Sequence, residues 1–91
     1  NNQITTEIAH LRGIALIQTG RVEEGLKQWE LILQQYPHLR STHIRMAEVL
    51  AQIGQEERAM HHLLMAEKSG KLDLLSDNLK KKLQSHLSAM R

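Results

Sequence analysis

Six histidines are the first residues in this 91-residue chain whose chemistry suggests a function, because imidazole nitrogens bind zinc and other transition metals. His61 and His62 are adjacent, and neighbouring residues of a helix point about 100° apart, so the two cannot face one ion. His38 and His43 flank the start of a predicted helix, where joint ligation is conceivable but has no further support. No histidine pair four residues apart is accompanied by an acidic third ligand. We therefore expect no metal site and no cofactor, and we expect the histidines to lie on the surface or to line a groove.

Serine, histidine and acidic side chains all occur in the chain, and in other proteins they combine in nucleophilic catalysis. Such catalysis needs an organised site, for example a serine on a sharp strand-to-helix turn or a glycine-rich loop that cradles phosphate. The sequence contains neither motif, and it has no Cys that could act as a nucleophile or form a disulfide. We therefore expect no catalytic residue, and we expect that the protein is not an enzyme.

Lysines 80–82 form a basic run that Lys68, Lys71 and Arg91 extend, and this run could contact phosphate groups. A solvated helix face is the simpler explanation for such a run. The chain has only one Trp and one Tyr to stack on bases. Twelve Lys and Arg nearly match ten Asp and Glu, which leaves a net charge of +2. We therefore rank nucleic-acid binding below protein binding.

The sequence contains no apolar run that approaches the roughly 20 residues needed to cross a bilayer. It also does not begin with the charged and apolar regions of a signal peptide. We therefore expect no membrane insertion and favour a cytoplasmic location, although the sequence leaves the location open. The chain begins with Asn1 rather than Met, and we expect it to be a fragment or a processed product.

Helices must position whatever site the chain has, because good helix formers dominate its composition and strand-favouring aromatic residues are scarce. Apolar residues recur at spacings of three and four, the period of a helix with one packed face. Gly20, Gly54, Gly70 and Pro37 mark helix ends. These signals predict an all-α domain with helices at about residues 4–19, 22–35, 39–53, 56–68 and 74–90.

The fifth predicted helix has two candidate capping residues, Asp73 and Ser76. Its apolar residues fall on one stripe, and its lysines are expected to face outward. The expected stripe consists of Leu72, Leu75, Leu79, Leu83, Leu87 and Met90.

The segment LIQTGRVEEGLKQW at 16–29 has a fainter copy, LAQIGQEERAMHHL, at 50–63. Two helices of this length with two tight turns need roughly 34 residues, which is the spacing of a stacked helical repeat. Gly13 and Gly25 lie inside predicted helices, where glycine costs roughly 1 kcal/mol relative to alanine, so a close backbone approach is expected at both. The pairs that recur 34 positions apart are Gly13 with Ala47, Leu16 with Leu50, Gln18 with Gln52, Gly20 with Gly54, Glu23 with Glu57, Gly25 with Ala59, and Trp29 with Leu63.

This pattern resembles the tetratricopeptide repeat family. The family's small, turn, small, aromatic and proline positions are occupied in repeat one, about residues 6–39, by Gly13, Gly20, Gly25, Trp29 and Pro37. In repeat two, about residues 40–73, the same positions hold Ala47, Gly54, Ala59, Leu63 and Lys71, so the aromatic residue and the proline are missing. The resemblance implies a single domain over residues 1–91, in which helix hairpins form a right-handed stack and residues 74–90 form a capping helix.

The resemblance also implies a binding surface, because in this family the first helices of successive hairpins line a concave groove that holds a partner segment. Isoleucines beside polar residues on that face would suit an apolar anchor of a partner, with hydrogen bonds around it. The alternative is that these isoleucines belong to the core. The residues that map to the groove are Glu7, His10, Ile14, Ile17, Gln18, Ser41, Ile44, Glu48, Ala51 and Gln52.

Two functions therefore stand first for this chain. One is a protein–protein interaction scaffold that binds a partner peptide or helix in the groove. The other is a structural module that associates with itself or with neighbouring repeats, because two repeats and a cap are fewer than the three that a stable solenoid usually needs. The identity of the partner does not follow from the sequence.

Overall fold

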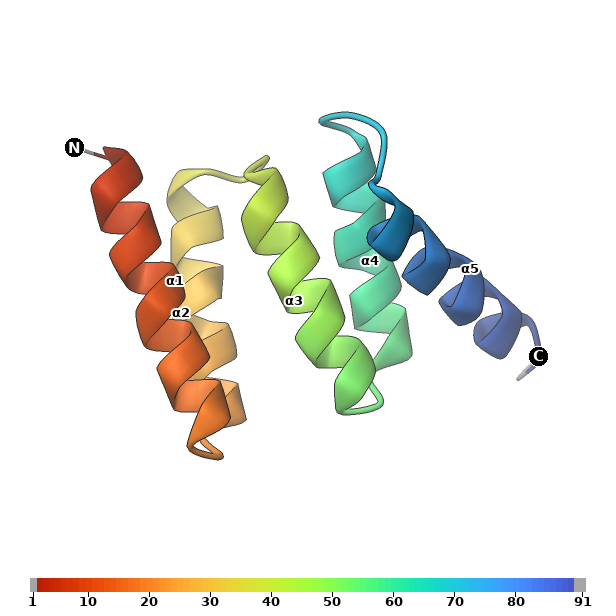
Figure 1. Cartoon of the computed structure of the whole chain (residues 1–91), viewed down its shortest axis with the longest axis horizontal. Helices are drawn as coiled ribbons and strands as arrows, with labels where there is room; N and C mark the ends of the chain where they lie inside the picture. The colour runs from red at the N-terminus through yellow and green to blue at the C-terminus, as the bar shows by residue number, and fades with distance from the viewer. Residues whose placement is uncertain (1, 90–91) are drawn as a thin grey trace. The chain divides into compact units, whose positions relative to one another are not determined.

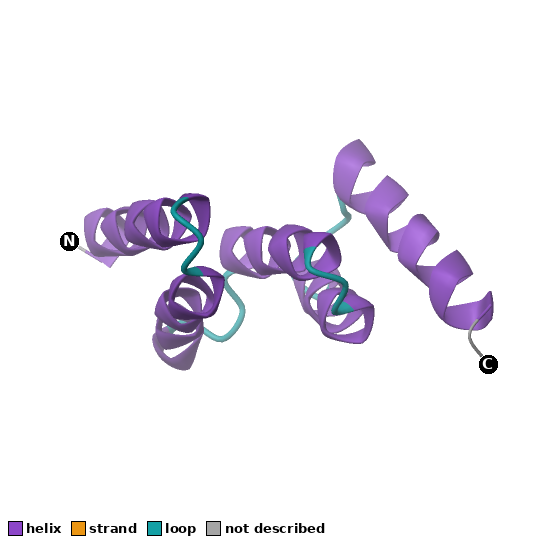
Figure 2. Ribbon diagram, turned by 90° about the horizontal axis from the view of Figure 1, so that it is seen from below, coloured by secondary structure: helices purple, strands orange, loops and turns teal. Residues whose placement is uncertain are grey.

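The computed structural model describes residues 2–89 of the chain, with side chains from residue 5. Within that range the chain forms five helices and no strand, joined by short loops (Figures 1 and 2). The predicted all-α class is therefore confirmed. The helices are α1 (Asn2–Gln18), α2 (Val22–Gln35), α3 (Arg40–Gln52), α4 (Glu56–Glu67) and α5 (Leu74–Ala89). None of them combines the length and the apolarity that a membrane-spanning helix requires.

The helices belong to two compact units. Unit 1 ends at Pro37 and contains the hairpin of α1 and α2, whereas unit 2 begins at His38 and contains the hairpin of α3 and α4 together with α5. Within unit 2, α5 packs mainly on α4. Each hairpin thus has a first and a second helix, in the order that the repeat spacing predicts.

A glycine in the left-handed conformation ends the first helix of unit 1. Gly20 has φ +88°, which a residue with a Cβ rarely adopts. Its N–H donates to the Ile17 carbonyl at 3.1 Å, and the Arg21 N–H donates to the Leu16 carbonyl at 2.8 Å. These two bonds form a Schellman motif, which satisfies carbonyls at the end of α1 and turns the chain directly into α2.

The turn of unit 2 repeats this geometry 34 residues later. Gly54 has φ +83° and donates its N–H to the Ala51 carbonyl at 3.2 Å. The Gln55 N–H donates to the Leu50 carbonyl at 2.8 Å. Each donor and each acceptor is therefore the counterpart, at the predicted spacing, of one in the first turn.

The hairpin of unit 1 is held by an unusually close approach of its two helices at two glycines. A Cβ added to Gly13 would lie 2.7 Å from Cε2 and 2.8 Å from Cδ1 of the Trp29 indole. A Cβ added to Gly25 would lie 2.6 Å from Cγ1 of Ile17 and 2.7 Å from the Gly13 carbonyl oxygen. Leu26 and Trp29 are at most 2 % exposed. Both glycines therefore have the packing reason that the sequence led us to expect.

The hairpin of unit 2 uses alanine where unit 1 uses glycine. Ala47 of α3 and Ala59 of α4 are fully buried, together with Leu50 and Leu63. Leu63 stands where unit 1 has Trp29, and it is smaller. The smaller Leu63 leaves space for the methyl group of Ala47. Ala51, the smaller counterpart of Ile17, leaves space for the methyl group of Ala59.

The start of α5 settles the choice between the two predicted caps. The Asp73 carboxylate accepts a hydrogen bond from the Ser76 N–H at 2.8 Å. This bond to the backbone favours the charged form and lowers the pKa of Asp73 below its ordinary value. Asp73 is therefore the capping residue, and Ser76 lies inside the helix.

The apolar stripe of α5 differs from the prediction at its first turn. Leu83 is 1 % exposed, but Leu75 is 81 % exposed and Ser76 is 5 % exposed. The reason is helical geometry, because seven residues return a helix to within about 20° of the same face, whereas eight do not. Ser76 therefore shares the face of Leu83, and Leu75 points away from it. Met90, the last predicted residue of the stripe, lies outside the described residues.

We expect Gly13→Ala to destabilise the protein, although alanine is the better helix former. The added methyl would force the Trp29 indole to move, and overpacking of this kind costs about 1–3 kcal/mol. Chemical denaturation followed by circular dichroism measures the loss, and the emission maximum of Trp29, the chain's single Trp, should shift in the folded variant.

Gly20→Ala is the matched control. It loses about 1–2 kcal/mol through the positive φ, but nothing lies within 4 Å of the added Cβ, so the Trp29 emission of the folded protein should stay unchanged. A Gly13→Ala protein as stable as the wild type would contradict the close packing described for this hairpin.

Candidate functional site

The residues predicted to line a groove on α1 do not share one environment. Glu7 and Gln18 are exposed, whereas Ile14 is half-buried. These three residues are separated by seven and four positions, so they lie on one face of the helix. They form an accessible strip with an isoleucine between polar side chains.

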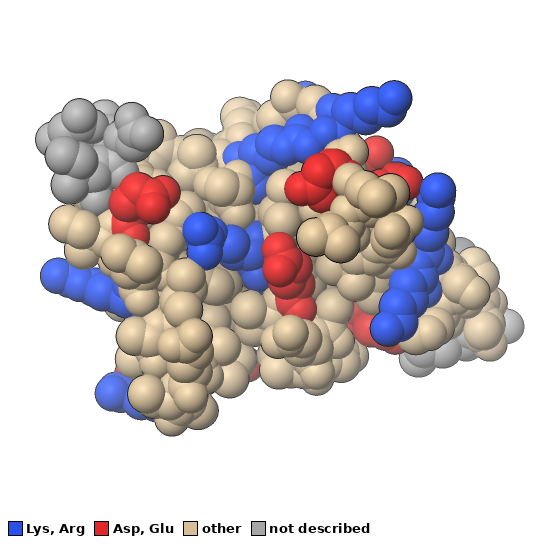
Figure 3. All heavy atoms as spheres, viewed as in Figure 1, with Lys and Arg blue, Asp and Glu red and all other residues tan. Residues whose placement is uncertain are grey.

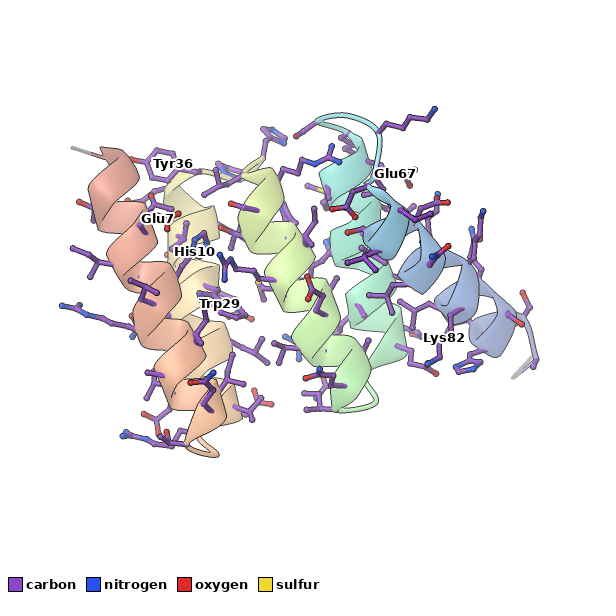
Figure 4. The ribbon with its side chains drawn as sticks, viewed as in Figure 1. Glu7, His10, Trp29, Tyr36, Glu67 and Lys82 are labelled. Carbon is purple, nitrogen blue, oxygen red and sulfur yellow. The ribbon has the colours of Figure 1, made fainter. Side chains whose placement is uncertain are left out.

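His10 does not belong to this strip. It is 1 % exposed, and its ring meets the Trp29 indole edge-on, with the ring centroids 6.3 Å apart. The indole Nε1–H donates to the His10 carbonyl at 3.3 Å, and the two residues lie between α1 and α2 (Figure 4). The prediction that His10 faces a partner is therefore corrected. Residue 10 lies one turn before Gly13, on the face of α1 that approaches α2 most closely.

Ile17 also faces the second helix of its hairpin. It is half-buried, and its side chain fills the space next to Gly25. Its spacing of four from Gly13 continues the inner face of α1. Of the two explanations that the sequence left open for Ile17, the packing role inside the hairpin is the one that its contacts support.

Leu11 is a surface residue that our sequence analysis did not assign to the binding face. It is 62 % exposed, and it lies three residues before Ile14 and seven before Gln18, which places it beside the accessible strip of α1. The expected close helix approach at Gly13 was the available signal, because Leu11 lies two residues before Gly13 and therefore about 200° around the helix from it.

The predicted residues of α3 show a similar division. Ser41, Glu48 and Gln52 are exposed, and Ile44 and Ala51 are half-buried. The three exposed residues stand 34 positions after Glu7, Ile14 and Gln18. Each unit therefore has its own strip, Glu7, Leu11, Ile14 and Gln18 on α1 and Ser41, Ile44, Glu48 and Gln52 on α3. These residues are the partner-binding face that is proposed below.

The three lysines at 80–82 on α5 have different surroundings. Lys80 Nζ lies 2.6 Å from Glu67 Oε1 on α4, and Lys81 Nζ lies 3.2 Å from Asp77 Oδ2 one turn earlier. Lys82 is exposed. Figure 3 shows acidic atoms close to the basic ones on this unit. Neutralised lysines attract phosphate weakly, so these contacts favour the solvated-face explanation of the run. They also correct the expectation for Lys80, which is half-buried.

A histidine contact connects the two helices of unit 2. His43 Nδ1 lies 2.9 Å from His62 Nδ1, and the ring of His61 lies 5.3 Å from that of His62 at an interplanar angle of 71°. His43 is 3 % exposed. The expectation that the histidines lie on the surface or in a groove is therefore wrong for His43, as it is for His10. Sequence reasoning had compared His43 with His38 and missed its neighbour across the hairpin.

Over the described part of the chain, no group of three or more His, Cys, Asp or Glu side chains is arranged to hold a metal ion. A shallow pocket of about 140 Å³ lies between α1 and α2 and is lined in part by Thr5, Ala9, Leu31 and Tyr36. Its lining combines apolar side chains with the hydroxyl groups of Thr5 and Tyr36 and with side-chain amides, and none of the described residues that line it is acidic or basic.

No protein-family model matches the sequence, and comparisons with curated proteins and with solved structures also find no match.

We expect Lys80 and Glu67 to couple by about 0.5–1 kcal/mol, because their contact is only partly exposed and joins α5 to α4. The measurement is a double-mutant cycle with Lys80→Met and Glu67→Gln, followed by thermal and chemical unfolding. Methionine retains much of the apolar stem of lysine and removes the charge.

The same cycle with Lys82→Met in place of Lys80→Met is the control, and it should give a coupling energy close to zero. An equal coupling for both lysines would show that the effect is a general one of net charge and not of the contact.

Proposed function

We propose that the protein is an interaction scaffold whose two hairpins stack as tetratricopeptide-like repeats and which binds a peptide or helix of a partner protein along α1 and α3. It acts by binding and has no catalytic step of its own. The observation that carries this proposal is the recurrence, 34 residues apart, of the same glycine turn and the same turn hydrogen bonds.

The repeated turn supports stacking for a physical reason. Hairpins with the same helix lengths and the same turn present similar faces, so one can pack on the next in a regular way. α2 and α4 begin 34 positions apart, at Val22 and Glu56, and α1 and α3 end 34 positions apart, at Gln18 and Gln52. The right-handed stack implied by the resemblance is part of this proposal.

The chemistry of the partner-binding face supports recognition of a mixed apolar and polar segment. Ile14 and Ile44 are half-buried, so each presents part of its apolar side chain to a partner. The remaining part is covered, which limits the unfavourable free energy of exposing it to water in the unbound protein. Gln18 and Gln52 provide amide donors and acceptors, and Glu48 provides a carboxylate. A partner segment with a branched apolar residue and a nearby Lys or Arg would match this set.

We expect Ile14→Glu and Ile44→Glu to abolish partner binding without loss of helicity. The new carboxylate would lose water against the apolar residue of the partner, whose Lys or Arg is expected to face Glu48, and this costs at least tenfold in affinity. The measurement uses peptides selected from a random displayed library against the wild-type protein, with affinities from isothermal titration calorimetry and helicity from circular dichroism.

Leu64→Glu is the matched control, because Leu64 is 46 % exposed on the second helix of its hairpin and is not part of the partner-binding face. It should leave peptide affinity unchanged. If Ile14→Glu and Ile44→Glu unfold the protein, these isoleucines belong to the core. If both fold and bind peptide normally, the proposed face is wrong.

Self-association is the second candidate function, and large exposed apolar side chains favour it. Leu74 and Leu75 at the start of α5 are 74 % and 81 % exposed, and Ile8 and Leu31 of unit 1 are 46 % and 49 % exposed. Side chains of this size are usually covered when they cluster. A second copy of the chain could cover them.

Sedimentation velocity over a hundredfold range of concentration tests self-association. If the exposed leucines mediate it, the wild type should show a concentration-dependent rise in mean mass, and Leu74→Gln with Leu75→Gln should abolish that rise. A strict monomer across the range would exclude this candidate and leave the interaction scaffold.

A further inference from the structure

The contact between His43 and His62 joins the two helices of unit 2 through polar atoms. His43 is 3 % exposed, His62 is half-buried, and their Nδ1 atoms lie 2.9 Å apart. Their ring centroids are 5.1 Å apart. This separation is close to that of two imidazoles placed end to end through their Nδ1 atoms, so each Nδ1 points at the other.

A contact of this length has room for one hydrogen between the rings. One Nδ1 must donate its hydrogen, and the other must accept with its lone pair. A first additional proton can enter at the Nε2 of the donating ring, because the Nδ1–H bond then remains and becomes charge-assisted. A second additional proton must enter at the Nδ1 that accepts the hydrogen bond. Both Nδ1 atoms then carry a hydrogen, and these two hydrogens face each other. The pair therefore holds one positive charge but not two.

The charges around His62 also oppose a second proton. The groups that act on it are His43 of α3 and His61 and Arg58 of α4, all of which are basic. Burial and these positive groups lower the pKa of His62 from 6.5 to about 4. This lowered pKa of His62 agrees with the geometry of the contact, which has no place for a hydrogen on both Nδ1 atoms.

The charged groups of α5, the third helix of unit 2, contact glutamates of α4. Where α5 packs on α4, Lys80 Nζ contacts Glu67 Oε1 at 2.6 Å and His86 Nδ1 contacts Glu56 Oε2 at 2.8 Å. Glu67 and Glu56 therefore interact with groups on α5. The His86–Glu56 contact is strongest when His86 is protonated, so it acts in the opposite direction to the His43–His62 contact as the pH falls.

We propose that the His43–His62 contact makes the packing of α3 on α4 depend on pH, so that a second proton on the pair opens the hairpin of unit 2. α3 also carries Ile44 and Glu48 of the partner-binding face. Opening would therefore release a bound partner at low pH, and this consequence alone rests on the proposed function.

The folded pair and the unfolded chain differ by one bound proton over a defined range of pH. The unfolded imidazole takes up its proton near pH 6.5, whereas the folded one does so near pH 4. Between these values the unfolded state binds the additional proton, so the unfolding equilibrium constant rises about tenfold for each unit by which the pH falls. The stabilisation is complete above pH 6.5 and is lost as the pH falls through 4.

Two measurements on the full chain test this proposal. Imidazole ¹⁵N shifts should show one protonated and one unprotonated Nδ1 at neutral pH, and the two rings should take up their protons at well-separated pH values. Hydrogen–deuterium exchange should show loss of protection in α3 and α4 between pH 6 and pH 4. The chain's single Trp and single Tyr, Trp29 and Tyr36, both lie in unit 1, so their fluorescence reports on that unit and serves as an internal reference.

His62→Asn is the decisive variant, because the asparagine amide can replace Nδ1 as a hydrogen-bond partner of His43 but cannot be protonated in this range. In His62→Asn, the tenfold rise of the unfolding equilibrium constant for each unit of falling pH between 6.5 and 4 should therefore be absent. His61→Asn, a substitution of the exposed neighbour on the same helix, should retain the wild-type slope. The His86–Glu56 contact is present in all three proteins, so its opposing effect cancels in the comparison.

Each other outcome overturns the proposal. Equal pH slopes for the wild type and His62→Asn would show that the pair does not control stability. Two rings that titrate together near pH 6.5 would show that the contact accommodates two charges, and this result needs no variant. A rise in melting temperature with Zn²⁺ that both His43→Asn and His62→Asn abolish would identify the pair as metal ligands instead.

Discussion

The left-handed glycine at the end of each first helix is the constraint on which the rest of the structure depends. With φ near +85°, Gly20 and Gly54 reverse the chain within two residues. The connection is therefore too short to let the ends of the two helices move apart. The two helices of each hairpin must then lie side by side along their whole length. Close packing at Gly13 and Gly25, and at Ala47 and Ala59, follows from that proximity.

This packing also decides which surface remains for a partner. In unit 1 the inner face of α1, with His10, Gly13 and Ile17, is occupied by α2. The strip through Leu11 and Ile14 remains accessible. It lies about 100° around the helix axis from the inner face. The binding surface that we propose follows by exclusion, since a residue can contact a partner only if it is not already packed inside the hairpin.

The polar contact inside unit 2 adds a second kind of constraint. Apolar packing between α3 and α4 is insensitive to pH, but the His43–His62 contact is directional and depends on a proton. In unit 1 the Trp29 indole meets the His10 backbone carbonyl through a donor that does not titrate. The two hairpins share one backbone turn and differ in the polar contact that joins their helices.

The sequence by itself determined the helices, their ends and the 34-residue spacing, because these depend on residues close together in the chain. The glycine turns and the boundaries of α2 illustrate this. Only the tertiary structure decided that His10 and Ile17 face α2, that Ser76 is buried in place of Leu75, and that His43 meets His62. The reason is that the rotation of a helix about its axis is set by contacts with residues far away in sequence, and a rotation of one residue step changes which side chains are accessible.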